Sequence, residues 1–260
     1  MRGTELPYCF SHALVRTPAE SAARGLRAVD AGDPDIGLFR AEHEHYCRAL
    51  TEAGMEVIRL EPLDRFPDSV FVEDPALVLP EAVILLRSAA QSRAGEGEHI
   101  APALQPYRPL FQLPEGYVDG GDILVTGREV IVGLSDRTDH AGFLVLRTLL
   151  GRWQYATRCV ELPDGLLHLK TGCSLLDGET ILAVGALASA GLFDGYDIIE
   201  LPPDEEAAAN AIRVNDHLLI SEGHGRTAQI LSQHGYRVVE IPTAQAALLD
   251  GGLSCMSLRF

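Results

Sequence analysis

The sequence predicts a single α/β domain built from repeated units of two strands, a helix and a third strand. Three observations lead to this fold class. Short apolar runs bounded by Gly, Pro or Asp recur along all 260 residues, which is the pattern of buried strands. Three longer stretches between them carry the periodicity and end signals of helices. No linker rich in Pro, Gly or Ser divides the chain, so residues 1–260 are predicted to form one domain.

The predicted strands are four to seven residues long and rich in Val, Ile and Leu. Turn-forming residues stand at their ends, so each run is separated from the next. The predicted strands cover residues 12–16, 56–60, 69–72, 82–86, 123–126, 129–132, 166–169, 180–184, 197–201, 217–220, 237–241 and 254–260.

Three helices are predicted, over residues 35–53, 138–150 and 227–234. A glycine follows each of them, at positions 54, 151 and 235, and glycine readily ends a helix. In the first helix the apolar side chains fall mainly on one face, as in an amphipathic helix. These apolar positions are Ile36, Phe39, Tyr46, Cys47 and Leu50.

Residues 68–86 and 119–133 are alike in order: an acidic segment, an apolar strand, a tight turn and a second strand. Residues 166–184 form a third version with a histidine in place of the acids, and residues 212–220 form a fourth. A fifth requires residues 254–260 to pair with the N-terminal strand. The sequence therefore predicts a divergent internal repeat whose closure brings polar strand ends to one axis.

The composition narrows the classes of function. With 21 basic and 37 acidic residues the chain has a net charge of −16, which disfavours phosphate backbones and anionic membranes as partners. The longest apolar run, 181–193, is shorter than the ~20 residues of a membrane-spanning helix. The N-terminus has no basic flank leading into an apolar stretch, so no signal peptide is predicted. Five cysteines without a C-x-x-C pair indicate a reducing compartment, which we expect to be the cytoplasm.

Two acidic segments are candidates for chemistry. Asp68, Glu73 and Asp74 bracket an apolar stretch, where a solvated strand end is the plain interpretation. If they are buried, however, they need cationic partners, and one guanidinium can be shared by several carboxylates. Asp119 and Asp122 flank two glycines, which fits a β-turn but also permits the close backbone approach of a crowded site.

A histidine and a cysteine complete the candidates. His168 lies between leucines, where a core histidine is the commoner outcome. Cys173 nearby is predicted to be a small buried hydrophobic residue. Cys255 follows Gly-Gly-Leu-Ser, and such a turn can present a thiol for nucleophilic attack when a histidine is close.

Taken in this order, the segments resemble a known family. The matching stretches are HALVRTP, FPDSVFVEDPALV, VDGGDILVTGREVIVGLSDRT, LLHLKTGCSLL and DGGLSCMS, which span nearly the whole chain. The chain resembles the dimethylarginine dimethylaminohydrolases of the guanidino-group-modifying (pentein) superfamily. The resemblance implies a five-bladed α/β propeller of ββαβ repeats around a polar central channel.

The resemblance also implies roles for individual residues. Cys255 is the expected nucleophile, His168 the general acid/base and Asp119 the acid that orients the histidine. The stretch after Arg16, with Gly25 and Leu26, is expected to form a lid. The expected substrate-binding residues are Asp68, Glu73 and Asp74 for the guanidinium and amine, Phe71 packing beside it, Arg93 and Arg137 gripping the α-carboxylate at the channel mouth, and Leu26 and Leu249 contacting the substrate.

The implied reaction is hydrolysis of Nω-methylated arginine to citrulline and an amine through a covalent cysteine intermediate, without metal or organic cofactor. Two alternatives remain: another hydrolase of the superfamily, such as an arginine deiminase, and a non-catalytic guanidine-binding propeller. The expected partners are the small-molecule substrate and at most a second copy of the chain as a homodimer, with no nucleic acid and no membrane.

Overall fold

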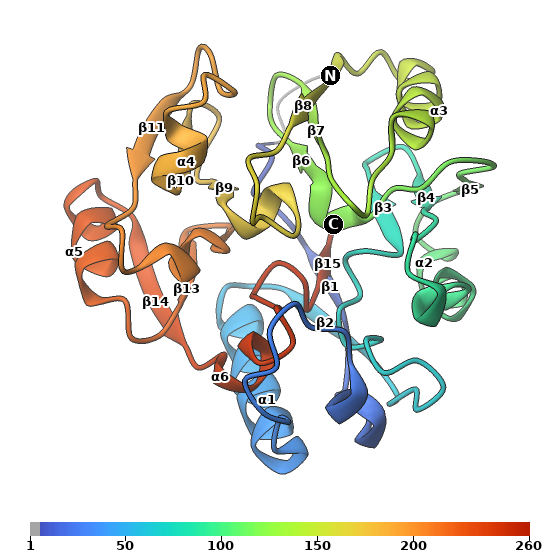
Figure 1. Cartoon of the computed structure of the whole chain (residues 1–260), viewed down its shortest axis with the longest axis horizontal. Helices are drawn as coiled ribbons and strands as arrows, with labels where there is room; N and C mark the ends of the chain where they lie inside the picture. The colour runs from blue at the N-terminus through green and yellow to red at the C-terminus, as the bar shows by residue number, and fades with distance from the viewer. Residues whose placement is uncertain (1–5) are drawn as a thin grey trace.

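In the computed structural model, which describes residues 6–260, five three-stranded sheets surround a common axis (Figure 1). In each sheet the inner strand runs antiparallel to the middle strand, and the outer strand runs parallel to it after a helical crossover. This is the ββαβ propeller expected from the sequence. The N-terminal segment for which no signal peptide is predicted begins at residues 1–5, which lie outside the described residues.

The sheets follow one another along the chain, except that the first contains both ends. From the inner strand outward they are β15 (Leu258–Arg259), β1 (His12–Arg16) and β2 (Glu56–Leu60); β3 (Ala76–Val78), β4 (Val83–Leu85) and β5 (Leu110–Gln112); β6 (Ile123–Val125), β7 (Val130–Leu134) and β8 (Thr157–Glu161); β9 (Cys173–Leu175), β10 (Thr180–Ala183) and β11 (Asp197–Glu200); and β12 (Ile212–Val214), β13 (His217–Ser221) and β14 (Arg237–Ile241).

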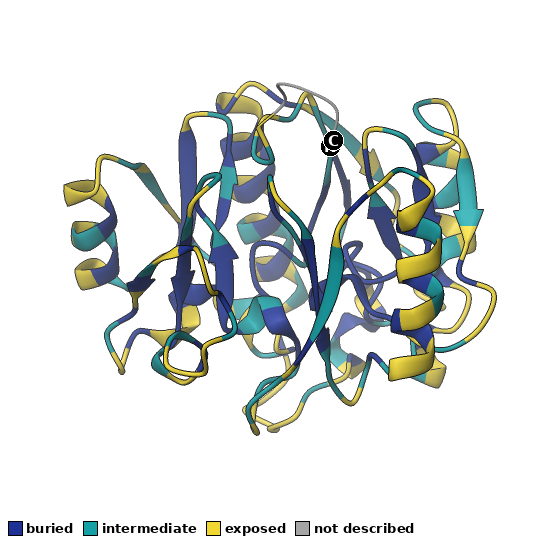
Figure 2. Ribbon diagram, turned by 90° about the horizontal axis from the view of Figure 1, so that it is seen from above, coloured by how far each residue is buried: buried dark blue, intermediate teal, exposed yellow. Residues whose placement is uncertain are grey.

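One α-helix crosses over in each repeat, on the outside of the ring, where its outer face is exposed (Figures 1 and 2). Within residues 6–260 no helix is both long and apolar enough to cross a membrane. The crossover helices are α1 (Ile36–Glu52), α2 (Ala101–Leu104), α3 (His140–Gly151), α4 (Gly185–Ala188) and α5 (Gly225–Gln233); α6 (Ala244–Ala247) and 3₁₀ turns at Glu20–Arg24, Gln91–Arg93, Glu96–His99, Gly120–Asp122, Leu169–Thr171 and Glu206–Ala209 lie in the loops.

Local sequence explains where the long helices begin. Asp35 caps α1 by accepting a hydrogen bond from the backbone N–H of Leu38 at 3.0 Å. Asp139 caps α3 in the same way, from Gly142 at 2.6 Å. The three helices predicted from sequence are therefore confirmed to within two residues at each end.

The two ends of the chain close the ring, as the repeat pattern predicts. β1 pairs with β15 in antiparallel register, with Ala13 opposite Arg259 and Leu14 opposite Leu258. The C-terminal strand thus supplies the inner strand of the first sheet, and this closure covers an edge that would otherwise be open. Only residues 258–259 of the predicted strand 254–260 pair, because the preceding residues form the loop that carries Cys255.

Two strand predictions are wrong. Residues 69–72 form turns in which Phe71 N–H donates to Asp68 C=O at 2.9 Å. Residues 166–169 lead into a 3₁₀ turn, and Leu169 N–H donates to the Asp122 carboxylate at 2.9 Å. In both segments the backbone groups find partners outside a ladder, and the inner strands β3 and β9 follow a few residues later.

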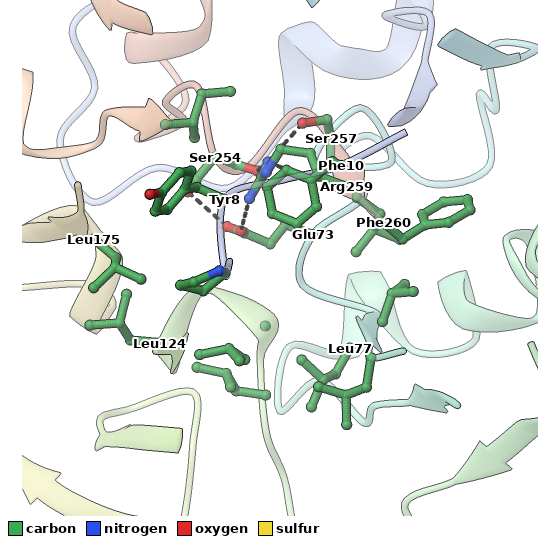
Figure 3. A pocket seen from close by; sticks show the side chains of 18 of the residues that line it. Tyr8, Phe10, Glu73, Leu77, Leu124, Leu175, Ser254, Ser257, Arg259 and Phe260 are labelled. Carbon is green, nitrogen blue, oxygen red and sulfur yellow. Dashed lines mark hydrogen bonds and ion pairs between the residues drawn. The ribbon is translucent and has the colours of Figure 1, made fainter. Parts of the chain in front are cut away.

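The inner strands surround an axial cavity of about 240 Å³ (Figure 3). Its walls are largely apolar, with Leu77, Leu124 and Leu175 from three different inner strands. Its polar wall is formed by Glu73, Ser254, Ser257 and Arg259, which the dashed lines of Figure 3 connect. The resemblance implied a polar central channel. The cavity is polar at the wall formed by Glu73, Ser254, Ser257 and Arg259, and it is apolar along the inner strands.

Candidate active site

The candidate site is assembled from the five short segments that lead into the inner strands. Each segment contributes one side chain to the group around the axis: Asp74 before β3, Asp119 before β6, His168 before β9, Asn210 before β12 and Cys255 before β15. Hydrogen bonds join these segments across the repeats, for example from Gly120 N–H to Asp74 C=O at 3.0 Å and from Glu73 N–H to Cys255 C=O at 3.2 Å. The ring of repeats thus places residues far apart in sequence at one end of the axis.

His168 lies between carboxylates. Its Nε2 is 3.3 Å from Asp119 Oδ2, and polar atoms of His168, Asp119 and Asp74 all lie within 4.8 Å of one another. Burial alone would lower the pKa of His168, but the charge of Asp74, the hydrogen bond to Asp119 and the charge of Asp122 outweigh it and raise the pKa to about 9. The imidazole is therefore protonated at neutral pH and can donate a proton.

The same three side chains have the spacing of a metal site. A protonated imidazole cannot ligate a metal, because metal binding requires the neutral ring. The carboxylates that raise the pKa of His168 therefore favour a site for proton transfer. The absence of a metal requirement stays a prediction.

Asp74 is buried and held by two donors. Gly121 N–H donates to Oδ1 at 2.9 Å and the Arg93 guanidinium to Oδ2 at 2.5 Å. Burial would raise the pKa of Asp74, but the charges of His168 and Arg93 outweigh it and lower the pKa to about 2. Asp74 is thus a carboxylate at any physiological pH, as binding a cationic group requires.

The glycines of both Gly-Gly pairs allow close approach, which the sequence predicts for Gly120 and Gly121. A Cβ on Gly121 would lie 2.8 Å from the His168 ring, and one on Gly120 would lie 2.1 Å from the carbonyl oxygen of Glu73. At the other pair, a Cβ on Gly251 would lie 2.2 Å from the Phe71 ring. Any side chain at these positions would push the site residues apart.

Cys255 is partly buried in the loop before β15. Burial, followed by the negative charges of Glu73 and Asp74, raises the pKa of its thiol to about 12. The resting site therefore holds a neutral thiol and a protonated histidine. Cys173, by contrast, is the fully buried first residue of β9, which confirms its prediction as a small buried hydrophobic residue.

Glu73 and Asp74 are adjacent but face different surroundings. Glu73 accepts from Lys170 Nζ at 2.5 Å, from Ser254 Oγ at 2.8 Å and from Arg259 at 3.2 Å, on the wall of the axial cavity. Both of its oxygens are occupied by these donors. Direct contact between Glu73 and the substrate stays a prediction, and in the structure Glu73 ties Lys170, Ser254 and Arg259 together on the cavity wall.

Asp68 lies beneath the predicted lid. Leu26 N–H donates to its Oδ1 at 2.8 Å, while Oδ2 is buried and has no hydrogen-bond partner among residues 6–260. Burial raises the pKa of Asp68, with Arg93 opposing the shift. A Cβ on Gly25 would lie 3.3 Å from Leu249, so the lid segment and Leu249 adjoin each other. The unpartnered oxygen is an open acceptor for a cationic ligand.

One of the two arginines differs from expectation in its placement. Arg93 is only 6% exposed and donates to Asp74, to Glu96 and to the carbonyl oxygen of Phe71. Arg137 Nη1 lies 3.9 Å from Asp119 Oδ2. Arg93 therefore pairs with a member of the carboxylate cluster, against the prediction that it stands away from it, because buried carboxylates draw in cations. The place of Arg137 at the channel mouth stays a prediction. The grip of both arginines on the substrate α-carboxylate stays a prediction.

Two residues of the site, Lys170 and Asn210, were not selected from the sequence, and Asp122 was named there as a flank of the Gly-Gly pair without a role of its own. Asp122 accepts from Thr138 Oγ1 at 2.6 Å and from Leu169 N–H, which fixes the segment after His168. Lys170 pairs with Glu73, and Asn210 contacts the Cys255 loop. Asn210 occupies the same place in its repeat as the other four site residues, and this position is the signal that could have identified it.

Comparison with known proteins agrees with this arrangement. No family model matches the chain. The N(G),N(G)-dimethylarginine dimethylaminohydrolase of Pseudomonas aeruginosa is 39% identical over 255 residues, covering 96% of this chain and all of that protein. The enzyme of the same name from Streptomyces coelicolor is 32% identical over 253 residues, covering 95% of this chain and 96% of its own length.

Solved structures give the same result. A cysteine-to-serine mutant of the Pseudomonas aeruginosa enzyme complexed with citrulline superposes with a TM-score of 0.94 at 38% identity, over 97% of this chain and all of that one. The N-terminal domain of the arginine dihydrolase ArgZ from cyanobacteria shares the fold alone, at 19% identity and a TM-score of 0.83, over 98% of this chain and 97% of that domain. The chain therefore belongs to the dimethylarginine dimethylaminohydrolase family.

Proposed function

We propose that this chain hydrolyses Nω-methylated arginines, asymmetric dimethylarginine and monomethylarginine, to citrulline and the corresponding methylamine, with Cys255 as nucleophile. The observation that carries this proposal is a protonated His168 held between Asp119 and Asp74, in the same ring of segments as the Cys255 thiol. The chain is a hydrolase acting on C–N bonds, as its relatives of 39% and 32% identity are by name. The citrulline complex of the 38% identical neighbour supports citrulline as the product.

Binding of the substrate cation follows from the charges. Asp74 is ionised, and the buried Oδ2 of Asp68 has no partner in the described part of the chain, so both can accept hydrogen bonds from a guanidinium and an amine. A bound cation beside Cys255 also offsets the charges of Glu73 and Asp74 that hold its pKa high. Substrate binding therefore favours loss of the thiol proton to solvent and produces the thiolate.

In the first half of the reaction the thiolate of Cys255 attacks the guanidinium carbon and forms a C–S bond. His168 donates its proton to the methylated nitrogen, and the C–N bond breaks to release the neutral amine. An S-alkylthiouronium remains on Cys255. Asp119 and Asp74 stabilise the imidazolium before the transfer and so set the cost of giving up the proton.

In the second half His168 is neutral and takes a proton from water. The resulting hydroxide attacks the thiouronium carbon, the C–S bond breaks, and citrulline leaves. The hydroxyl proton of the tetrahedral intermediate passes to the departing sulfur, so Cys255 recovers as the neutral thiol and His168 again carries its proton. His168 supplies the proton to the leaving amine and accepts one from the attacking water, while the thiol proton of Cys255 exchanges with solvent.

The deciding experiment presents asymmetric dimethylarginine and arginine side by side and measures citrulline and the released amine. We expect citrulline and dimethylamine from wild type, and no turnover from Cys255→Ser. Release of ammonia from arginine at a higher kcat/KM would identify a deiminase instead. Tight binding of both ligands without citrulline would identify a guanidine-binding propeller.

The cellular setting belongs to the same proposal. All five cysteines are free thiols, which suits the reducing cytoplasm. Assembly as a homodimer is tested by light scattering at enzyme concentrations used in the assay.

A further inference from the structure

Asn210 links the segment that carries His168 to the loop that carries Cys255. It is buried at the end of the 3₁₀ turn Glu206–Ala209 and immediately before the short connection into β12. In the other four repeats the corresponding segment carries Asp74, Asp119, His168 or Cys255. The proposed reaction gives Asn210 no role of its own.

The hydrogen bonds of Asn210 reach both loops from one planar amide. Its Nδ2 donates to the carbonyl oxygen of Lys170 at 3.0 Å, two residues after His168. The same nitrogen lies 3.1 Å from Ser254 Oγ, and Oδ1 accepts from Ser254 N–H at 2.8 Å, one residue before Cys255. The segment that carries the acid/base and the segment that carries the nucleophile are therefore joined through a single side chain.

Two further contacts leave the amide little freedom. A Cβ on Gly252 would lie 2.5 Å from Asn210 Cγ, so glycine at that position lets the Cys255 loop pack directly on the amide. Ser254 Oγ donates onward to Glu73, which is anchored by Lys170 and Arg259. The donors and acceptors around Asn210 are thus fixed from both sides.

Nδ2 also lies within reach of the nucleophile, so one of its two N–H groups can be shared between Ser254 Oγ and Cys255 Sγ. It lies 3.9 Å from Cys255 Sγ, a long contact for a neutral thiol, which is a weak acceptor. A thiolate is a stronger acceptor, and hydrogen bonds to charged groups are shorter and stronger than those to neutral ones. The contact therefore gains strength when the thiol loses its proton.

We propose that Asn210 is a positioning residue that fixes Cys255 relative to His168 and stabilises the Cys255 thiolate through Nδ2. The proposal rests on Cys255 being the nucleophile of the proposed function. Only an amide offers a donor and an acceptor in this planar arrangement. Aspartate keeps the shape but loses the donor, and alanine loses both groups.

The test measures kcat, KM and the rate constant for iodoacetamide alkylation at Cys255, resolved by peptide mass, between pH 7 and 10. Asn210→Asp should lower kcat and the alkylation rate constant at least about tenfold at each pH, the loss of one hydrogen bond to a charged group. KM should change less than about threefold, because none of the hydrogen bonds of Asn210 goes to Asp68, Asp74, Arg93 or Arg137. Asn210→Ala buries no new charge and carries the test if the aspartate variant does not fold.

Asn215 provides a matched control. Its amide also joins two distant segments, accepting from Phe10 N–H at 3.0 Å and donating to the carbonyl oxygen of Ala53 at 2.7 Å, outside the site. Asn215→Asp should lower thermal stability and leave the Cys255 alkylation rate constant unchanged.

The outcomes separate this inference from the proposed function. Folded Asn210 variants with wild-type kcat and alkylation rates would overturn the positioning role, and so would faster alkylation, which indicates a loop that is only loosened. If Cys255→Ser keeps its turnover, the proposed function itself fails.

Discussion

Two buried histidines show how neighbouring groups set the charge of a side chain. His43, on α1, is buried, and its burial together with the charge of nearby Arg59 lowers its pKa to about 4. His168 is equally buried, but three acids around it raise its pKa to about 9. The residue type is the same, and the number of carboxylates within reach decides which histidine carries a proton.

The first prediction concerns pH. Below about pH 9 both Cys255 and His168 are protonated in the resting site. The proposed reaction needs the Cys255 thiolate together with the His168 imidazolium, so the reactive form carries one proton fewer than the resting form. The value of kcat/KM should therefore rise with pH and level off near 9, where His168 loses its proton.

His168→Gln supplies the comparison for this profile. It should lower kcat by about 10²- to 10⁴-fold, and its kcat/KM should keep rising above pH 9, because only the thiol then titrates. A variant with the wild-type profile would return His168 to a purely structural role.

The second prediction separates the adjacent acids. Asp74→Asn should weaken binding of cationic guanidines about ten- to a hundredfold and affect neutral citrulline far less, because a charge-assisted hydrogen bond becomes an ordinary one. Glu73→Gln should instead lower the melting temperature, since Lys170 and Arg259 lose their shared carboxylate. Affinities for both ligands and melting curves of each variant check this. An equal loss for guanidine and citrulline in Asp74→Asn would contradict the binding role.

At the scale of elements, the short segments before the inner strands carry the site, and turns interrupt their backbones. These turns lie at 69–72, Gly120–Asp122 and Leu169–Thr171, next to Asp74, Asp119 and His168. Glycine makes this crowding feasible where two segments touch. The elements therefore hold the site through backbone contacts as much as through side chains.

The third prediction tests that crowding. Gly121→Ala places a Cβ 2.8 Å from the His168 ring and 3.0 Å from Asp74 Oδ1, so the ring must move and kcat should fall at least about a hundredfold. Gly151→Ala, at the end of α3, meets no atom within 4 Å and should keep full activity. Steady-state kinetics of the two variants, with circular dichroism to confirm folding, test this prediction. A wild-type kcat in Gly121→Ala would show that the position of the His168 ring does not depend on glycine at position 121.

At the scale of the whole molecule, the ring is closed by two residues of β15. Leu258 is buried between β1 and the apolar cluster of the second sheet, with Leu14, Val72 and Val83. The loop with Cys255 lies directly before this strand, so ring closure and presentation of the nucleophile depend on the same segment. Stability and activity are coupled there.

The fourth prediction follows from this coupling. Leu258→Ala should lower the free energy of unfolding by about 2–5 kcal/mol, the usual cost of a buried leucine truncation. Leu144→Ala on α3, where the side chain is 38% exposed, should change it by less than about 0.5 kcal/mol. Urea unfolding of both variants measures the difference, and a similar small loss in each would mean that the ring does not depend on this closure.

Local and repeated features of the fold could be predicted from the sequence. Asp35 and Gly54 mark the ends of α1 because each acts on the backbone of residues next to it in the chain. The short apolar runs predicted most of the middle and outer strands. The motifs around Asp119, His168 and Cys255 identified the family, because a motif is a local string that needs no knowledge of packing. These predictions depend on residues close together in the chain.

Tertiary structure decided the rest. The sequence treated Glu73 and Asp74 as one group, yet one lies on the wall of the axial cavity and the other binds Arg93 and contacts the His168 cluster. The pairing of Arg93 with Asp74 spans 19 residues, and Asn210 was overlooked because its partners Lys170, Ser254 and Cys255 lie 40 to 45 residues away along the chain. The partner of a buried polar side chain depends on how five separate repeats pack around one axis. The free energy of that packing comes from contacts between repeats, so no single segment of the sequence determines it.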